Sequence, residues 1–163
     1  MSEPDLIIRR LVERGFEFVL IGGLAAVVHG VSLSTRDADI CCSFDFDNVL
    51  KLHSLLTDLH PVHRLTPQRL PFDFEEGLFR RLQNLYLSTD LGTLDCLSSV
   101  LGLGDYPQVR QQSIELQLWG GVCRILTIDA LILSKQATNR PHDQQTIAQL
   151  RIIQARQRPP EAT

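Results

Sequence analysis

An apolar run that ends in two consecutive glycines, with two aspartates close behind it, constrains this chain more than any other feature. Residues 16–21 are rich in strand-forming side chains, Gly22 and Gly23 follow at once, and Asp37 and Asp39 stand two residues apart. A strand that passes through a Gly-Gly turn into a helix leaves backbone N–H groups open to an anion, because glycine has no Cβ to obstruct it. The pattern therefore predicts neighbouring strands and helices, with a site where they meet.

Length and charge limit the architecture and the partners. The chain has 163 residues, enough to bury a hydrophobic core, and we expect one domain over residues 1–157 and a disordered tail over residues 158–163. It carries 16 Lys and Arg residues against 19 Asp and Glu residues. A long nucleic acid is bound through many phosphate contacts from basic side chains, so this balance disfavours a large RNA or DNA footprint.

From the hydropathy and the N-terminal residues we expect a cytoplasmic protein with no membrane segment. No apolar stretch approaches the roughly 20 residues that a membrane-spanning helix needs. The chain opens with Ser, Glu, Pro and Asp after the initial Met, which is unlike a signal peptide. The cysteines lack the C-x-x-C spacing of a zinc site, and adjacent cysteines are poorly placed to pair with each other. We expect reduced, mostly buried thiols at Cys41, Cys42, Cys96 and Cys123.

Capping signals and apolar periodicity predict alternating helices and strands. Ser2 and Asp5 have the spacing of a capping box, and Ser43 or Asp45 can cap a later helix. Apolar residues at helical or strand spacing complete the assignment. We expect helices at residues 3–14, 23–29, 46–60, 127–137 and 141–156, and strands at residues 16–21, 37–42, 62–65, 82–89, 93–98, 114–119 and 122–126.

The clearest hairpin joins residues 114–119 to residues 122–126. Gly120 and Gly121 separate these strands, and two glycines readily adopt the positive φ angles of a two-residue turn. A loop that contains Gly102 is expected before the hairpin. Together these elements predict an α/β (α+β) fold in which helices flank a small, mixed, twisted sheet.

Three aspartates are the candidate metal ligands. Asp37 and Asp39 share one face of the expected strand, because side chains two residues apart on a strand point the same way. Two carboxylates so close repel each other, and Mg²⁺ prefers oxygen ligands, so the pair can form a metal clamp; two solvated aspartates are the alternative. Asp95 stands in an otherwise apolar strand and needs a partner, either a metal, an arginine or a turn that it caps.

Four segments of the chain carry a family resemblance. They are residues 21–30, which begin Ile-Gly-Gly-Leu-Ala-Ala; 35–40, Thr-Arg-Asp-Ala-Asp-Ile; 92–106, which begin Gly-Thr-Leu-Asp; and 135–143, Lys-Gln-Ala-Thr-Asn-Arg-Pro-His-Asp. With this content the chain resembles the nucleotidyltransferase-fold superfamily that includes DNA polymerase beta. It is most similar to the small stand-alone bacterial members, toxin-like ones included. The order of Gly-Gly before Asp-x-Asp is the most specific part of the resemblance.

The resemblance implies a reaction and a role for each acidic residue. It implies that an NMP group passes from an NTP to an acceptor, with release of pyrophosphate, by a two-metal mechanism that uses Mg²⁺ (or Mn²⁺). Asp37 and Asp39 would hold both ions, and Asp95 would complete the metal set and lie near the acceptor. Gly22 and Gly23 would lie against the triphosphate.

Basic residues of the same segments are expected to bind the nucleotide. The resemblance places Lys135 and Arg140 near the NTP, and Asp143 can orient one of them by charge pairing; solvated helix-end charges are the alternative. Arg36 directly precedes the metal pair and can either hold a phosphate or face water. Two positions depart from the family pattern. Leu33 replaces a frequent arginine and His142 a frequent lysine, and both changes remove cationic charge.

The acceptor and the partners are open on sequence alone. The acceptor can be a small molecule, a protein side chain or an RNA end such as that of a tRNA. An antitoxin or a second copy of the chain is a further partner. The rival function is a non-catalytic module of the same fold, which binds nucleotide or acts as a toxin-antitoxin component without transferring anything. A local basic patch could contact tRNA through Arg64, Arg69, Arg80 and Arg81.

Overall fold

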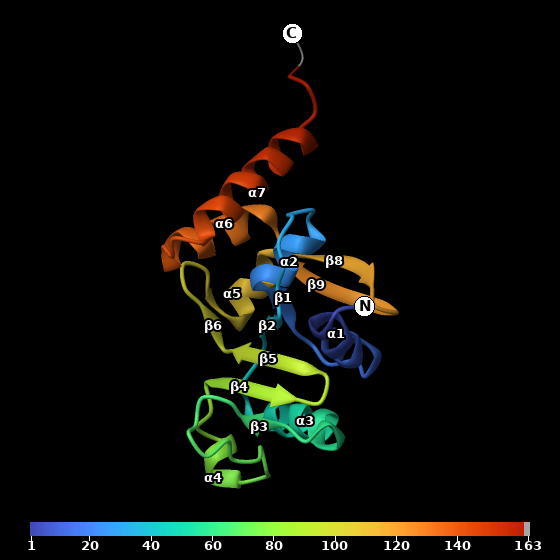
Figure 1. Ribbon diagram of the computed structural model, residues 1–163, viewed down its shortest axis with the longest axis vertical. Helices are drawn as coiled ribbons and strands as arrows, with labels where there is room; N and C mark the ends of the chain where they lie inside the picture. Colours follow the sequence, from blue (N-terminus) through green and yellow to red (C-terminus); the bar gives the residue numbers. More distant parts are fainter. Residues whose placement is uncertain (162–163) are drawn as a thin grey trace.

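Seven strands of the computed structural model, which describes residues 1–161, form one mixed sheet (Figure 1). They are β1 (Val19–Ile21), β2 (Asp37–Cys41), β3 (Val62–His63), β4 (Asn84–Thr89), β5 (Gly92–Leu97), β8 (Ser113–Leu118) and β9 (Gly121–Leu126). Their order in the sheet is β3-β4-β5-β2-β1-β9-β8. A separate two-stranded sheet consists of β6 (Ser99–Val100) and β7 (Gly104–Asp105).

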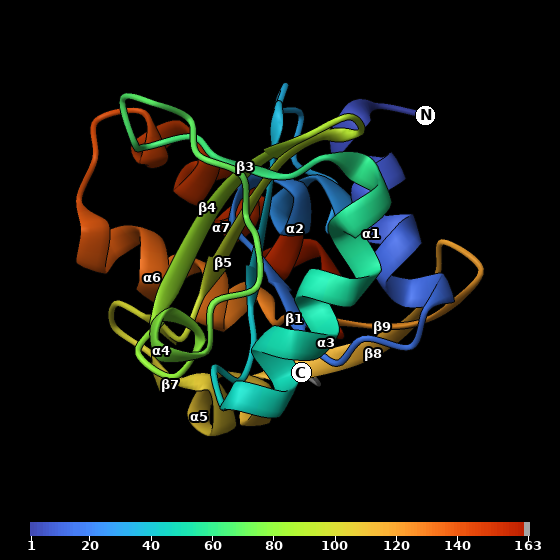
Figure 2. The same cartoon turned by 90° about the horizontal axis from the view of Figure 1, so that it is seen from below.

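Helices flank this sheet, which confirms the expected fold class. Figure 2 shows α1 and α3 together on one side of β4 and β5, with α6 on the other side. The last two long helices, α6 and α7, pack against each other, and α6 also contacts α2. The helices are α1 (Glu3–Glu13), α2 (Gly22–Val28), α3 (Phe46–Leu56), α4 (Glu76–Phe79), α5 (Tyr106–Gln111), α6 (Ile128–Thr138) and α7 (Asp143–Gln157), with a 3-10 turn η1 (Thr57–Leu59).

The centre of the sheet brings together segments that are far apart in the sequence. Strand β2 pairs antiparallel to β1 and parallel to β5. The register places Asp39 opposite Ile21 on one side and opposite Asp95 on the other. Because α2 begins at Gly22, directly after β1, the glycine turn and two of the aspartates meet at one place in the sheet.

Local capping signals set the starts of the helices as expected. The Ser2 hydroxyl and backbone N–H both donate to Asp5, which completes the capping box of α1. The Asp45 carboxylate accepts a hydrogen bond of 2.8 Å from the backbone N–H of Asn48 at the start of α3. The Thr127 side chain likewise caps α6. These caps depend on residues three apart, so the sequence alone reveals them.

Some elements are shorter than expected, since β1 begins at Val19, α3 ends at Leu56 and β3 ends at His63. Two parts of the fold differ more substantially from the sequence expectation. The hairpin turn consists of Trp119 and Gly120, both at positive φ, because Leu118 pairs with Gly121. Gly120 is therefore the second residue of the turn, and Gly121 is the first residue of β9. The second difference lies after β5, where β6, β7 and α5 were not expected. The start of α5 does carry a signal: Asp105 and Gln108 form a capping box.

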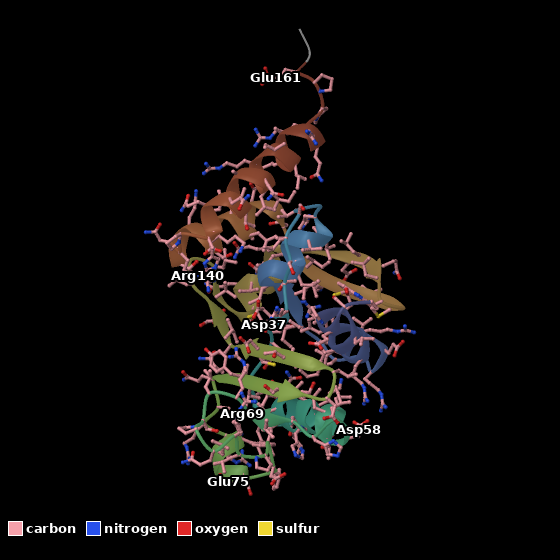
Figure 3. The ribbon with its side chains drawn as sticks, in the orientation of Figure 1. Asp37, Asp58, Arg69, Glu75, Arg140 and Glu161 are labelled. Carbon is pink, nitrogen blue, oxygen red and sulfur yellow. The ribbon has the colours of Figure 1, made fainter. Side chains whose placement is uncertain are left out.

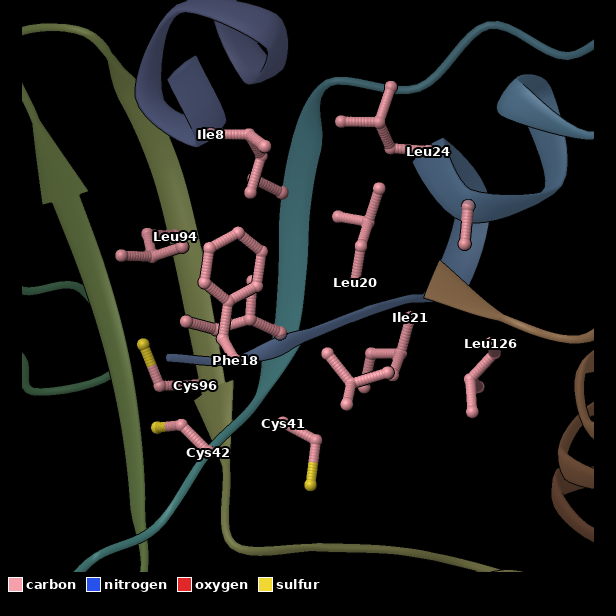
Figure 4. Close-up of a cluster of buried hydrophobic side chains, with 14 of the residues drawn as sticks. Ile8, Phe18, Leu20, Ile21, Leu24, Cys41, Cys42, Leu94, Cys96 and Leu126 are labelled. Atoms are coloured by element: carbon pink, nitrogen blue, oxygen red, sulfur yellow. The ribbon is translucent and has the colours of Figure 1, made fainter. Parts of the chain in front are cut away.

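The buried side chains form one hydrophobic cluster, part of which is shown in Figure 4. Strand β1 belongs to this cluster: Leu20 is fully buried, and Phe18, directly before the strand, is only 4% exposed. All four cysteines are free and buried, as expected. Burial raises the pKa of the Cys41 thiol to about 12, so this thiol stays protonated at neutral pH.

The C-terminal segment follows α7. Residues 158–161 adopt neither helix nor strand and are exposed. The remaining residues of the expected disordered tail, 162 and 163, lie outside the described part of the chain. Within residues 1–161, every helix is too short or too polar to span a bilayer.

Candidate active site

A cleft of about 1030 Å³ opens where β1 ends and β2 begins. Its walls come from β2, β4, β5, α6 and the β6–β7 loop. In Figure 3, Asp37 lies between Arg140, toward the α6–α7 side, and Arg69, toward the β3–β4 side. The cleft walls include most of the residues expected at the site, namely Gly22, Asp37, Asp39, Asp95, Lys135 and Arg140.

The three aspartates converge in this cleft. Asp37 and Asp39 project from one face of β2, and Asp95 occupies the position opposite Asp39 on the parallel strand β5. Burial, followed by the charges of Asp95 and Asp37, raises the pKa of Asp39 to about 6, although Arg140 and Lys135 act in the opposite direction. The cleft therefore concentrates negative charge where the strands pair, and a bound cation would relieve that repulsion.

Asp95 is bound by an arginine that the sequence did not single out as its partner. The Arg64 guanidinium donates from Nη2 to Asp95 Oδ1 at 2.6 Å and from Nε to the same oxygen at 3.1 Å, and Nη2 also contacts Oδ2. The hydrogen bonds to Asp95 raise the pKa of Arg64 above its ordinary value. An arginine was one of the partners foreseen for Asp95, but 31 residues separate the two and no local pattern links them.

The donor set fits a divalent cation at Asp37 and Asp39. Two carboxylates on one strand face are oxygen ligands of the type that Mg²⁺ and Mn²⁺ prefer. Burial is the main cause of the raised pKa of Asp39, and the charges of Asp95 and then of Asp37 add to it. Over residues 1–161, however, no group of three or more His, Cys, Asp or Glu side chains is arranged to hold a metal. Asp95 contacts Arg64 instead, so Asp37 and Asp39 are the residues that fit the ion.

The glycine turn lies directly beside this acidic pair. Gly22 has a φ of +69°, and a Cβ at this position would stand 3.0 Å from the Asp39 Cγ. Gly23 is already helical, and a Cβ there would meet Thr35 Oγ1 at 3.2 Å. Gly22 lines the cleft, whereas Gly23 packs behind it against the loop that leads into β2.

A buried ion pair orients the basic side of the cleft. Asp143, which is 1% exposed, accepts hydrogen bonds of 3.2 Å from Lys135 Nζ and from Arg140 Nε. The Thr138 hydroxyl donates to the same carboxylate at 3.1 Å. Burial alone would raise the pKa of Asp143, but the hydrogen bond and charge of Lys135 hold it below its ordinary value. Asp143 therefore stays ionised and positions both cations.

Arg36, Leu33 and His142 lie outside the cleft walls. Arg36 is exposed, directly before β2, and is not among the residues that line the cleft. Leu33 is 41% exposed, and its side chain packs beside Gly23. The His142 side chain is 73% exposed and lies 3.8 Å from Asp143. The expected basic patch is partly neutralised, because Arg64 binds Asp95 and Arg80 forms an ion pair with Glu76.

Comparison with known proteins identifies the fold. No protein-family model matches the chain, and no curated protein matches it. Lincomycin-bound LnuA, a lincosamide antibiotic adenylyltransferase, aligns with a TM-score of 0.63 and 16% identity over 93% of this chain and 96% of its own. The antibiotic-resistance factor ANT(2'')-Ia aligns with a TM-score of 0.57 and 15% identity over 94% of this chain and 83% of its own.

A second structure of ANT(2'')-Ia, in complex with adenylyl-2''-tobramycin, gives a consistent result. It aligns with a TM-score of 0.56 and 14% identity over 94% of this chain and 95% of its own. These similar structures extend over nearly the whole length of the chain and include the sheet that carries the cleft. The chain has the nucleotidyltransferase fold.

Proposed function

We propose that residues 1–157 form a single domain that transfers an NMP group from an NTP to a small-molecule acceptor and releases pyrophosphate. The observation that carries this proposal is the convergence of Asp37, Asp39 and Asp95 in one cleft, beside the turn at Gly22. The enzymes of similar fold act in the same sense: LnuA is an adenylyltransferase of lincosamide antibiotics, and ANT(2'')-Ia was observed with adenylyl-2''-tobramycin.

The acidic residues take two different roles in this proposal. Asp37 and Asp39 would hold Mg²⁺ or Mn²⁺ in a two-metal mechanism, and the ions would neutralise charge on the triphosphate and activate the acceptor oxygen. Asp95 lies on β5, next to β4, whose residues Asn84 and Tyr86 also line the cleft. We assign it to the acceptor, whose hydroxyl it would orient and deprotonate as the new bond to the α-phosphorus forms and the bond to pyrophosphate breaks.

The basic and glycine residues would position the nucleotide. Lys135 and Arg140 line the cleft and are held by Asp143, so their charges are oriented before any ligand binds. Gly22 lets the triphosphate approach the backbone, and Gly23 supports the same turn. Arg36, which is exposed next to Asp37, would meet a phosphate only at the edge of the site.

Transfer of label tests the proposal. Each of the four NTPs, labelled at the α-phosphate, is incubated with the purified chain, Mg²⁺ or Mn²⁺, and either lincomycin, tobramycin or a small-molecule extract of cells as acceptor. We expect a labelled product that Asp37→Asn and Asp39→Asn abolish. Asp73→Asn, which changes an exposed aspartate outside the cleft, is the matched control and should retain full transfer.

The rival function gives a different result in the same experiment. A non-catalytic module would bind NTP without forming any labelled product. Binding measured by calorimetry, together with no label above the level of the Asp37→Asn variant for every NTP and acceptor, would therefore refute the transferase and support the binding module.

A further inference from the structure

We propose that Arg64 is a positioning residue that holds Asp95 out of the cation site, so that Asp37 and Asp39 bind the divalent ion and Asp95 is reserved for the acceptor. This inference rests on the proposed function, because it assigns separate roles to the three aspartates of that site. It assigns a role to Arg64, a side chain that lies outside the motifs by which the site was found.

The first observation is an asymmetry among the three carboxylates. Asp95 accepts hydrogen bonds from Arg64 on both of its oxygens. For Asp37 and Asp39, in contrast, the described part of the chain contains no ion pair. A cation that approached Asp95 would have to displace a guanidinium that cannot lose its proton, whereas Asp37 and Asp39 offer free oxygens.

The second observation is that Arg64 is anchored independently of Asp95. Its backbone N–H donates to the Tyr86 carbonyl at 3.0 Å, and its guanidinium lies over the Tyr86 ring, 5.6 Å from the ring centre. Tyr86 in turn pairs with Asp95 in the register of β4 and β5. The contacts with Tyr86 therefore hold the guanidinium next to Asp95, and its planar N–H donors match the geometry of the carboxylate.

The third observation is the position of the pair across the sheet. The order β4-β5-β2 places Asp95 between the Asp37–Asp39 pair and the β4 residues Asn84 and Tyr86, which line the same cleft. Lys135 belongs to α6, which Figure 1 shows on the other side of β2 from β5 and β4. An acceptor on the β4 side would meet Arg64 and Asp95 together, with one donor and one acceptor for its hydroxyl group.

Manganese binding without nucleotide tests this division directly. Free Mn²⁺ is measured by electron paramagnetic resonance during titration of the whole chain and its variants, all checked for folding by circular dichroism. We expect Arg64→Met to tighten Mn²⁺ binding about tenfold by freeing Asp95 as a ligand, and Asp37→Asn to weaken it by at least about tenfold. Asp95→Asn should change the affinity by less than about threefold.

Two further variants separate this mechanism from a general effect of charge. Arg140→Met removes a cation that contacts Asp143 rather than Asp95 in the same cleft. Its charge acts on Asp39, so this variant should tighten Mn²⁺ binding through net charge alone, by less than about threefold. Arg64→Met combined with Asp95→Asn should lose the gain of Arg64→Met and return to the affinity of the unaltered chain. The double variant also removes the unpaired carboxylate, so it controls for any loss of folding in the single variant.

Several results would overturn the assignment. If Asp95→Asn weakened Mn²⁺ binding as much as Asp37→Asn does, Asp95 would be a ligand despite Arg64. If Arg140→Met and Arg64→Met increased the Mn²⁺ affinity equally, the increase would be an effect of net charge and not of freeing Asp95. If Arg64→Met gave no increase, or the unaltered chain bound no Mn²⁺, the proposed role of Arg64 would be wrong. The Mn²⁺ titration contains no NTP and so does not depend on transfer. If the variants showed the expected Mn²⁺ affinities but the transfer assay gave no labelled product, only the proposed transfer reaction would be refuted.

Discussion

The Asp39 carboxylate occupies the space that a Cβ on Gly22 would need. A side chain at Gly22 would place its Cβ 3.0 Å from both the Cβ and the Cγ of Asp39, a distance at which one of the groups must move. Gly22 also has a φ of +69°, a backbone conformation that residues other than glycine adopt only at a cost in free energy. The turn between β1 and α2 can therefore approach the acidic pair this closely only with glycine.

Gly22→Ala should destabilise the chain and disable the cleft. We expect a loss of about 3 kcal/mol in the free energy of unfolding, from backbone strain and from overpacking against Asp39. Gly15→Ala is the matched control, because Gly15 has a similar φ of +66° with nothing within 4 Å of its Cβ position. It should lose only about 1 kcal/mol. Urea unfolding measures both, and equal losses would contradict the clash with Asp39.

The raised pKa of Asp39 predicts how stability depends on pH. Burial and the charges of Asp95 and Asp37 raise this pKa to about 6. Asp39 therefore binds a proton more readily in the folded chain than in the unfolded chain. The stability that protonated Asp39 contributes is fully present below pH ~4 and is lost as the pH rises through ~6. Asp39→Asn should remove the loss and stabilise the metal-free chain at pH 7.5 by about 1–3 kcal/mol.

Urea unfolding in the presence of a chelator measures this effect at pH 4.5 and pH 7.5. The gain from Asp39→Asn should be present at pH 7.5 and much smaller at pH 4.5, while Asp73→Asn should leave stability nearly unchanged at both. A gain of the same size at the two pH values would show that Asp39 does not titrate between them.

Asp143 should matter for both stability and nucleotide binding. It is 1% exposed and is the hydrogen-bond partner of Lys135, which is itself 8% exposed. Asp143→Asn leaves a buried ammonium without its counter-charge and should cost about 3–5 kcal/mol of unfolding free energy. The same variant should weaken ATP binding in calorimetry, because the cations of the cleft lose their orientation.

An exposed ion pair provides the control for Asp143. Glu76 and Arg80 pair at 2.8 Å, but both side chains are more than half exposed. Glu76→Gln should therefore cost less than about 0.5 kcal/mol and leave ATP binding unchanged. If Asp143→Asn proved as mild as Glu76→Gln, the buried pair would contribute little to either property.

The cysteines should be unreactive in the folded chain. All four are buried, and burial raises the pKa of Cys41 and of Cys123 to about 12. Since the thiolate is the reactive form, we expect a disulfide reagent such as Ellman's to modify less than about one thiol per chain within minutes. All four should react at once in 6 M guanidinium chloride. Rapid modification of the native chain would show that the core around Cys41 opens readily.

Local chemistry explains which elements were predicted correctly. The Asp45 cap of α3 and the Ser2 capping box of α1 depend on neighbours three residues away, and both appear as expected. The hairpin turn shows the limit of such signals. Its position depends on which residues of β8 and β9 pair, and that pairing puts Trp119 rather than Gly121 in the turn, where the Trp119 indole N–H donates to Asp5 at 3.1 Å.

Alternation along a strand and the freedom of glycine are local properties, so the sequence is enough to predict that Asp37 and Asp39 share a strand face beside a glycine turn. The surroundings of this pair depend on tertiary contacts. The parallel pairing of β2 and β5 sets Asp95 opposite Asp39, and the β3–β4 edge supplies Arg64 to Asp95. Such contacts join residues far apart in the chain, so the packing of the sheet selects them and no local pattern encodes them.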